Sequence, residues 1–519
     1  MKRLIAVMTG IMAFALLVSS PVNAAENTPT FNQDVGQIVF DNCSSCHREN
    51  QIAPMSLMSY KETRPWARAI KAKVVSREMP PWFADPQYGE FSNDISLSDD
   101  EIATIVAWAD GGAPEGHGPA PDAPNFSADG WGHPSGLDPD YVIEFPVTWH
   151  VQADGEMPNF NVYQPLPFND KMSVSATQVR PGNYAATHHI TTALANIPEG
   201  MKVGRGPAWP GGPMFDYALI PDPDAAADKS AAEVAAELAD DGEGLTRRTR
   251  SGTLTSSRGV PRETSDEAAK VTEQERRELA RARGGFGPYI PGVAADVAKP
   301  GQGREIRGDL FDHIVWNMHY QSTGQPETAR PSIGAWFAND EITTYQQTLS
   351  TNEYTSESEQ LIAPAPRTRK ERLAAGELPL QIAQNINPLL APIPPNAANW
   401  TVTGIGAFQN DSIIQSLFIH AHLRGKDFTY VLTYPDGREE ILLRVPNYQF
   451  DWQFEYELTQ PLKVPAGSTL KTIARYDNSR ANRSNPAPDK ETYWSEQSWD
   501  DMFLTNAKYI LDGEEANDN

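Results

Sequence analysis

The chain has 519 residues, of which 43 are basic and 68 are acidic, giving a formal net charge of −25. This balance argues against a nucleic-acid partner, because the phosphates would be repelled. Only two residues are cysteines. They lie three positions apart, which makes a poor structural disulfide, so their presence calls for a chemical explanation.

The first residues predict an exported protein. Two basic residues precede an apolar run from Leu4 to Val18, and the small-residue sequence VNA follows at 22–24. This order is typical of a secretory signal peptide, here residues 1–24; an uncleaved anchor is the alternative. No later segment has 18 uninterrupted apolar residues, so we expect a periplasmic or secreted protein with no stable membrane span.

The two cysteines belong to the sequence Cys43-Ser44-Ser45-Cys46-His47. This spacing fits the attachment of c-type haem. Each thiol can add to one vinyl group of the porphyrin, and the imidazole that follows offers the iron its proximal ligand. A thioredoxin-like dithiol is the alternative, but a dithiol has no need of the histidine. We therefore predict one covalent haem c, bound by Cys43, Cys46 and His47.

A second iron ligand is expected from a methionine or another histidine. Met79 ends a predicted helix just before two prolines, which would fix the direction of its side chain. Met55 and Met58 follow the haem histidine closely and are better explained as filler of the apolar wall. His117 lies in a Gly/Pro-rich tail. The sequence therefore favours Met79 as the distal ligand.

The composition and hydrophobic periodicity of the chain change along its length. Helical periodicity predicts a small all-α cytochrome c domain at 28–118, and a Pro-, Gly- and Asp-rich linker follows at 119–139. Further on, short β-branched and aromatic runs such as "FDHIVWNMHYQS" and "FTYVLTYP" predict two all-β sandwich domains. We place these domains at 140–350 and 380–515. An aromatic-free insertion interrupts the first of them at 218–285.

Five histidines outside the haem motif have the character of metal ligands. His420 and His422 would share one face of a strand and suit Zn, Cu or Ni, although an exposed strand can carry such a pair without a metal. His188 and His189 are adjacent, so they converge only at a turn or twist; otherwise one is buried and one exposed. His319 would supply a third nitrogen.

Several segments in a fixed order make the downstream chain recognisable: "RPGN…HHI", "GFGPYIPG", "NMHYQSTG", "HAHLRGKDF", "YPDG", "YDNSRANRSNPAP" and "SEQSWDDMF". Together they resemble the copper type II, ascorbate-dependent monooxygenase family, which includes the peptidylglycine α-hydroxylating and dopamine β-type enzymes. The resemblance covers roughly residues 140 to 515. A cytochrome c domain in front recurs in bacterial relatives of this type.

The resemblance implies two jelly-roll-like domains with one copper on each. The ligands it implies are His188, His189 and His319 for one copper, and His420, His422 and Met502 for the other. Three imidazoles suit copper as an electron store, whereas two imidazoles and a thioether favour Cu(I), the state that reacts with dioxygen. Packing beside its aromatic neighbours is the alternative role for Met502.

The substrate is where the chain departs from the family. The peptide hydroxylases hold their substrate with an arginine and a tyrosine, and the corresponding positions here are Phe418 and Asn506. A peptide carboxylate would lose those partners. We therefore expect a small, uncharged or apolar organic substrate.

These observations predict a periplasmic haem–copper monooxygenase with a non-coupled dicopper centre. The haem would receive electrons from an external redox protein or small reductant, and the copper centre would activate O₂ and hydroxylate a C–H bond. The alternative is a non-catalytic electron carrier or copper-binding protein with the same ligands. A β-sandwich adhesin with an appended cytochrome is a third possibility.

Overall fold

The computed structural model describes most of the chain. The described ranges are 28–49, 51–126, 130–155, 157–198, 200–209, 211–223, 285–291, 295–338, 342, 344–351, 353–354, 392–494 and 498–513. The predicted signal peptide at 1–24 and residues 224–284 of the predicted insertion lie outside these ranges. The first residues assigned to that insertion, 218–221, are the end of a strand.

The predicted fold class is wrong. The chain is mostly β, with 39% strand and 11% helix, and it contains no sizeable all-α cytochrome domain among its described residues. Prolines and glycines cut the helical patterns short, because proline cannot donate to the helical ladder. Non-helical stretches, such as residues 80–97, therefore separate the short helices.

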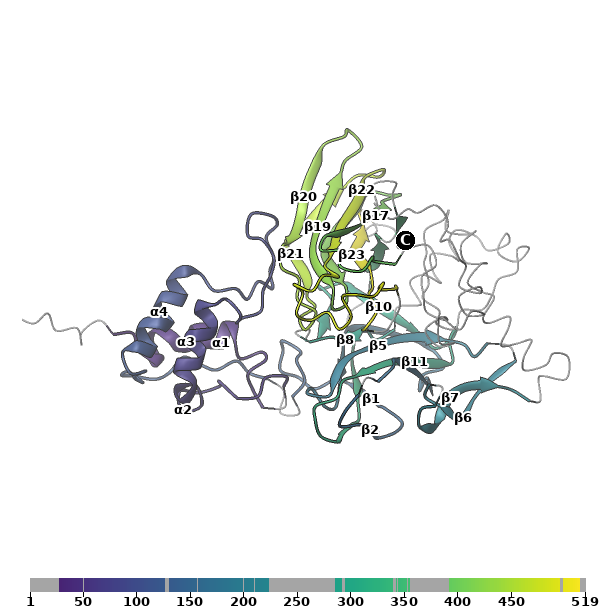
Figure 1. The fold of residues 1–519 in the computed structure, drawn as a ribbon, viewed down its shortest axis with the longest axis horizontal. Helices are drawn as coiled ribbons and strands as arrows, with labels where there is room; N and C mark the ends of the chain where they lie inside the picture. The colour runs from purple at the N-terminus through teal and green to yellow at the C-terminus, as the bar shows by residue number, and fades with distance from the viewer. Residues whose placement is uncertain are drawn as a thin grey trace, which may run out of the picture.

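The helices gather in the N-terminal part of the chain, drawn in purple and blue (Figure 1). They are a π-helical turn (Phe31–Val35), α1 (Gly36–Asn42), α2 (Tyr60–Thr63), a 3₁₀ turn (Arg64–Trp66), α3 (Ala67–Val75) and α4 (Asp99–Asp110). Ser98 caps α4, accepting a hydrogen bond from the Glu101 N–H while the Glu101 carboxylate accepts one from the Ser98 N–H. The helices surround a small apolar core that includes the fully buried Phe31, Ile105 and Trp108.

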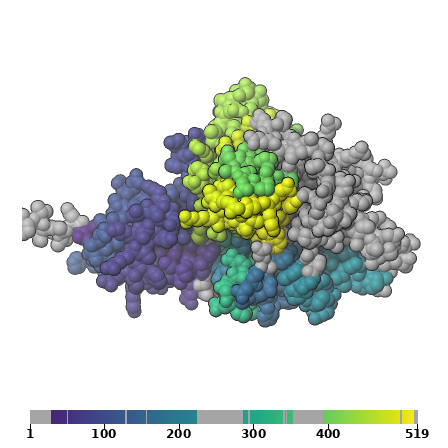
Figure 2. Space-filling model, viewed as in Figure 1, coloured from purple at the N-terminus to yellow at the C-terminus, as the bar shows by residue number. Residues whose placement is uncertain are grey.

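An extended segment, residues 80–97, connects α3 with α4 and contacts the C-terminal strands. The rings of Trp82 and Tyr456 lie 5.1 Å apart, and Phe91 forms an isolated bridge with Leu458. The Asn93 amide donates to the Glu455 carbonyl at 2.7 Å. The N-terminal helices, here called the helical lobe (residues 31–110), lie beside the green and yellow C-terminal residues in Figure 2. The contacts of residues 80–97 hold the lobe in this position.

The first β unit follows the helices. Its strands are β1 (Tyr141–Glu144), β2 (Trp149–Val151), β3 (Phe160–Pro165), β4 (Lys171–Arg180), β5 (Thr187–Ala195), β6 (Met201–Pro207), β7 (Met214–Pro221), β8 (Pro288–Tyr289), β9 (Asp296–Val297), β10 (Gln302–Arg307), β11 (His313–Tyr320), β12 (Glu327–Ala329), β13 (Ser332–Phe337) and β14 (Thr344–Tyr345). One sheet has the order β1-β13-β4-β10-β14, with β9 beside β4, and a second has the order β3-β11-β5-β8. Two further pairs are β2 with β12 and β6 with β7.

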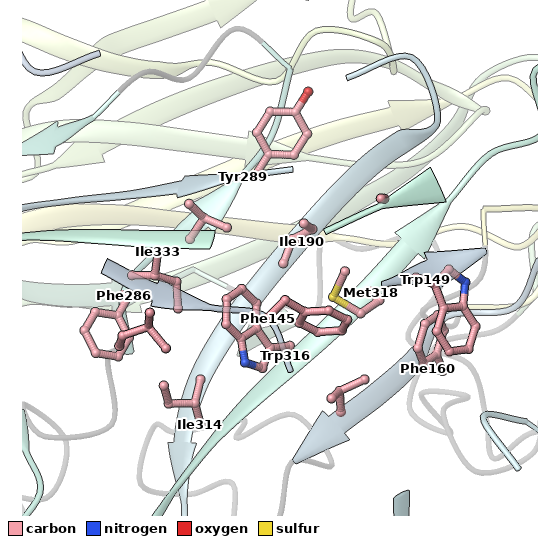
Figure 3. Packing of buried hydrophobic residues seen from close by; sticks show 14 of the residues in the cluster. Phe145, Trp149, Phe160, Ile190, Phe286, Tyr289, Ile314, Trp316, Met318 and Ile333 are labelled. Carbon is pink, nitrogen blue, oxygen red and sulfur yellow. The ribbon is translucent and has the colours of Figure 1, made fainter. Parts of the chain in front are cut away.

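The core of this unit is built from alternate residues of its strands. Ile190 on β5 and Met318 on β11 are directly paired and fully buried. They lie near Trp316 and Phe145, whose rings meet edge to face at 5.1 Å (Figure 3). Because side chains alternate along a strand, the residues next to Ile190 and Met318 point to the other face of the sheet. Those neighbours include His189.

The second β unit comprises β15 (Gln347–Ser350), β16 (Glu353–Tyr354), β17 (Trp400–Ala407), β18 (Ser412–His420), β19 (Gly425–Thr433), β20 (Glu439–Val445), β21 (Glu455–Val464), β22 (Thr469–Tyr476) and β23 (Leu504–Leu511). Its sheets have the orders β15-β23-β18-β21 and β16-β17-β22-β19-β20. A jelly roll has eight strands. The main sheets here have six and four strands in the first unit and four and five in the second, so the predicted jelly-roll class is also wrong.

Polar contacts fix the two β units against each other. The Lys508 ammonium on β23 lies 3.0 Å from the Asp296 carboxylate of the first unit and 2.7 Å from the Glu455 carboxylate of the second. The Gln415 amide donates to the Gln302 side chain at 2.8 Å. Among the described residues, no helix is long and apolar enough to cross a membrane.

Candidate metal centre

Three of the predicted ligands come together on the paired strands β5 and β11. His319 lies directly opposite His189 in the antiparallel register, so both side chains share one face. The register then shifts, so that Tyr320 pairs with Thr187 and His188 is left as the extra residue of a β-bulge. A bulge bends its strand and redirects a side chain. It therefore explains how two adjacent histidines can turn toward one point.

The three imidazoles are close enough to share a metal ion. Nδ1 of His189 lies 3.1 Å from Nδ1 of His188 and 3.4 Å from Nδ1 of His319. One ligand nitrogen from each residue lies within 4.8 Å of the others. All three side chains are buried, and Nε2 of His188 has no hydrogen-bond partner.

Burial keeps these histidines neutral. It lowers the pKa of His188 and His189 well below the usual value, and the neighbouring imidazoles add to the effect. Burial likewise lowers the pKa of His319 to about 4, with a further contribution from His420. A neutral imidazole offers a lone pair to a metal, so this cluster is ready to bind one at neutral pH.

The second pair of histidines lies at the end of β18. The rings of His420 and His422 are 5.1 Å apart, and both are buried. Nδ1 of His420 lies 2.5 Å from Oε1 of Gln453, and an N–H donated there leaves Nε2 free for a metal. Neither ring nitrogen of His422 has a partner. Burial lowers the pKa of His420 to about 4 and that of His422 well below its usual value.

Met502 is held beside this pair through its backbone. β18 and β23 pair antiparallel, and their ladder ends where His420 lies opposite Leu504. Oδ1 of Asp501 accepts the N–H groups of both His422 and Met502 at 2.9 Å. Its Oδ2 accepts the N–H of Arg424 at 3.0 Å. One carboxylate therefore fixes the backbone of two predicted ligands, while burial raises its pKa to about 6.

The two clusters are neighbours. The rings of His189 and His420 are 6.3 Å apart, although they belong to different β units. Phe450 stacks on His188 with the ring centroids 4.1 Å apart, and its ring lies 5.8 Å from that of His422. The five imidazoles therefore form one continuous buried group between the two units.

The haem motif forms a single turn after α1. The N–H groups of Cys46 and His47 donate to the Cys43 carbonyl at 3.3 and 2.9 Å, and both thiols are free. Nδ1 of His47 lies 3.2 Å from the Met55 carbonyl. A hydrogen bond donated there leaves Nε2 as the lone-pair donor. These residues therefore fit covalent haem attachment with His47 as the proximal ligand.

The predicted distal ligand is less closely connected to the motif. Met79 follows α3, where its N–H donates to the Lys73 carbonyl at 3.3 Å. Among the described residues, Met79 makes no hydrogen bond to the haem motif and is not one of the apolar side chains that pack with Cys43 against the helical core. Met55 is the methionine whose backbone reaches His47, and its side chain packs against the helical core.

Two tyrosines lie close both to the haem motif and to the strand that carries His188 and His189. The rings of Tyr184 and Tyr289 are 5.7 Å apart, and Tyr289 pairs with Ile190, the residue after His189. Burial raises the pKa of Tyr289, and the negative charges of Tyr184 and Cys46 add to this. A cysteine of the motif therefore lies near β8, the edge strand that pairs with the histidine-bearing β5.

The comparisons with known proteins give no family. No protein-family model matches the chain, and no curated protein matches it. Among solved structures, PNGF-II is 8% identical with a TM-score of 0.22; the match covers 71% of this chain and 65% of that one. The coconut allergen cocosin is 8% identical with a TM-score of 0.12, over 72% of this chain and 84% of that one. Likenesses this weak assign neither fold nor function.

Several important residues were not predicted from the sequence. They are Asp501, Gln453, Phe450, Tyr184 and Tyr289. Only Asp501 had a local signal, since it adjoins Met502. The others act through contacts that join distant parts of the chain.

Proposed function

We propose that the protein is a haem–copper monooxygenase that hydroxylates a C–H bond of a small organic molecule. The observation that carries this proposal is the group of five buried, neutral imidazoles, with the backbone of Met502 joined to that of His422 through Asp501. Nitrogen donors suit copper, and a thioether favours its reduced state. The motif resemblance to the copper type II, ascorbate-dependent monooxygenases supports the same assignment.

The chain's own residues would hold the metals and control their surroundings. Copper, when bound, would supply the reduction of O₂, and haem c would supply one-electron storage. His188, His189 and His319 would hold one copper, while His420, His422 and Met502 would hold the other. Gln453 and Asp501 fix the orientation of the second set, and the buried position of the rings limits the access of water.

The overall reaction would consume one C–H bond, one O₂ molecule, two electrons and two protons. Its products would be one hydroxyl group and one water molecule. The electrons would come from an external reductant. The proximity of Cys46 to Tyr289, and of Tyr289 to the strand of His189, supports entry on the haem side.

Metal analysis and product analysis test this proposal together. The full chain, exported with haem attachment and loaded with copper, is expected to contain one iron and two coppers. With a reductant and a panel of uncharged organic compounds, it should consume O₂ and form a hydroxylated product. Oxygen consumption without an organic product would favour the non-catalytic electron carrier. Iron without copper would overturn both the monooxygenase and the copper-binding carrier.

Single-residue variants refine that test. His422→Ala is expected to remove one copper and abolish hydroxylation while the haem spectrum stays intact. His150→Ala is the matched control, because His150 is an exposed histidine on β2, a strand that pairs with β12 and not with the strands of the clusters. Equal losses in both variants would count against a role for His422 in holding metal.

The export prediction has its own test. Residues 1–24 are proposed to direct the protein to the periplasm or the medium. N-terminal sequencing of the mature protein should begin at Ala25, and cell fractionation should find it outside the cytoplasm. An intact N-terminus in a cytoplasmic fraction would contradict both export and haem attachment.

A further inference from the structure

We propose that an exposed stripe on the helical lobe is the docking surface for the external electron donor, and that this donor is a redox protein with an acidic face. The stripe, here called the α2–α3 stripe, consists of Lys61, Arg64, Arg68, Ala72 and Val75. The inference rests on the proposed function, since it concerns the protein that would deliver electrons to the haem.

The α2–α3 stripe is one side of a continuous helical run. α2, the 3₁₀ turn and α3 follow one another without a gap from 60 to 75. The stripe residues are spaced three or four positions apart, so they share one face of the run. All of them are exposed, whereas Ala67, Ile70 and Val74 are buried in the lobe. The run therefore packs into the lobe by one face and leaves the stripe open to solvent.

The charge of the stripe is opposite to that of the whole chain, whose formal net charge is −25. Among the described residues, Lys61, Arg64 and Arg68 form no ion pair, whereas Lys71 on the same run binds the Asp110 carboxylate. Unpaired cations on an acidic protein attract an acidic partner to this face, while the rest of the surface repels it. The stripe would therefore orient such a partner as well as bind it.

The surroundings of the stripe fit a protein partner. Glu62 is the only acidic residue from 60 to 75, and its carboxylate accepts a hydrogen bond from the Ser59 hydroxyl at 2.7 Å. Val75 is 57% exposed, and Trp66 on the same run is 44% exposed. Exposed apolar surface rimmed by charged residues is typical of protein–protein interaction sites.

A hollow adjoins both the stripe and the residues next to the haem motif. Its volume is about 690 Å³, and its lining includes two of the basic stripe residues, Glu115, and the apolar side chains of Phe40 and Met58. Phe40 lies on α1, which leads directly into the motif. Leu57, next to Met58, donates its N–H to the His47 carbonyl at 2.8 Å. A protein bound at the stripe would therefore lie close to the residues that carry the haem.

Contacts with the rest of the chain cover another part of the helical lobe. The Gln51 amide, just after the haem motif, donates to the Gly130 carbonyl at 3.0 Å. Residues 80–97 contact the C-terminal strands, where Phe91 bridges to Leu458. An external protein has to approach the lobe from a face that these contacts leave open, and the α2–α3 stripe is such a face.

The length of the stripe favours a protein over a small reductant. The stripe extends from 61 to 75, and a helix rises about 1.5 Å per residue, so it is roughly 20 Å long. A small molecule would contact one or two of its side chains, whereas the surface of a protein can contact its basic and apolar ends together. Contacts between redox proteins are small and transient, and they depend on electrostatic steering.

The kinetics of haem reduction test the docking surface. The probe is reduced plant-type ferredoxin, an acidic one-electron carrier, mixed with the haem-loaded full chain while the haem absorbance is followed. The second-order rate constant should fall as salt is added, because salt screens the attraction. Arg64→Glu/Arg68→Glu should lower the rate constant at low salt by roughly tenfold or more and remove most of its salt dependence.

Lys299→Glu/Arg483→Glu is the matched control. Both positions carry exposed basic residues in the β units, and the double change alters the net charge by the same amount. Its rate constant should stay within about twofold of the wild type. Equal slowing in both double variants would overturn the docking surface. If Arg64→Glu/Arg68→Glu loses the wild-type haem spectrum, Arg64→Gln/Arg68→Gln, with Lys299→Gln/Arg483→Gln as its control, gives the same comparison.

Cross-linking adds a measurement that does not depend on electron transfer. A carbodiimide joins a lysine to a carboxylate in contact with it, so mass spectrometry should find Lys61 linked to ferredoxin. Links confined to lysines of the β units would overturn the proposal. A chain that holds haem and copper and hydroxylates, but is reduced by ferredoxin equally well in both double variants, would lose the docking surface and keep the monooxygenase proposal. A chain that binds no haem would refute both.

Discussion

The two histidine clusters meet in space but are built differently. His188, His189 and His319 lie on two strands that pair along their whole length, and a bulge in that pairing turns His188 inward. His420 and His422 lie where a strand ends, and Met502 comes from a separate loop. The first cluster depends on sheet register, whereas the second depends on a few hydrogen bonds to Gln453 and Asp501. The second cluster should therefore be the easier one to disrupt.

The largest effect is expected from Asp501→Ala. This change leaves three backbone N–H groups without an acceptor, two of them buried and that of Met502 partly buried, and each buried group costs about 1–3 kcal/mol. The free energy of unfolding should fall by roughly 3–5 kcal/mol, and copper should be lost from the second cluster but kept by the first. Denaturant unfolding and metal analysis measure these two effects.

Asp436→Ala is the control for that variant. Asp436 is an exposed aspartate that accepts one backbone N–H, from Arg438, in a turn. Its loss should cost no more than about 1 kcal/mol and leave both coppers in place. If Asp501→Ala behaved like this control, the carboxylate would not be holding the second cluster together.

Acidification should lower the free energy of unfolding of the metal-free protein. The folded pKa values of His319 and His420 are lowered to about 4, so in the unfolded chain these residues take up protons at higher pH than in the folded one. Their stability contribution is present above pH 6.5 and is lost as the pH falls toward 4, at about 1.4 kcal/mol per pH unit for each histidine. Asp501, with its pKa raised to about 6, acts in the opposite direction.

Denaturant titrations between pH 4 and 7 measure this dependence. His319→Gln and His420→Gln should each make the curve shallower, because each removes one group that titrates differently in the two states. A wild-type curve that stays flat across this range would contradict the burial of neutral imidazoles in both clusters.

A smaller and more local effect is expected from Gln453→Leu. The change removes the acceptor that orients His420, and loss of such a partner typically weakens metal affinity 10–100-fold. Competition with a copper chelator should show this loss at the second cluster only. Gln453→Glu keeps an acceptor and should retain most of the affinity. If Gln453→Leu lowered the copper affinity of both clusters equally, the two clusters would not be held in place by different residues.

The smallest effect is expected in the N-terminal helices, which carry none of the five clustered histidines. Ser98→Ala removes the N-cap of α4 and should cost about 1 kcal/mol, with no change in copper binding. Thermal unfolding and metal analysis measure both quantities. A loss of copper in this variant would indicate that the helical lobe supports the histidine clusters. We expect no such loss, because the second cluster is held by Gln453 and Asp501.

The sequence predicted individual strands well because their alternating patterns are local. The run "FDHIVWNMHYQS" contains β11, and "FTYVLTYP" contains most of β19. The fold class failed because helical periodicity near prolines was extended into an all-α domain. The arrangement of strands in the sheets depends on long-range pairing, which no local pattern reveals.

The candidate site, too, could be predicted from the sequence only where its geometry depends on neighbouring residues. The pattern His420-x-His422 indicates a shared face, and the structure brings these residues together. The convergence of His188 with His189 depends on a bulge, which arises only from the register against β11. Phe450 lies far from His188 in sequence but stacks on it in the structure. Contacts of this kind carry no signal in a single sequence.

In the proposed function, the five imidazoles hold copper for oxygen chemistry on an organic substrate. The most direct test is turnover under ¹⁸O₂ with the haem- and copper-loaded full chain, an added reductant and a substrate panel, followed by mass spectrometry. We expect one labelled oxygen atom in the hydroxylated product for each O₂ consumed, and none when His422 is replaced by alanine. Oxygen consumption with no label in any organic product would contradict it.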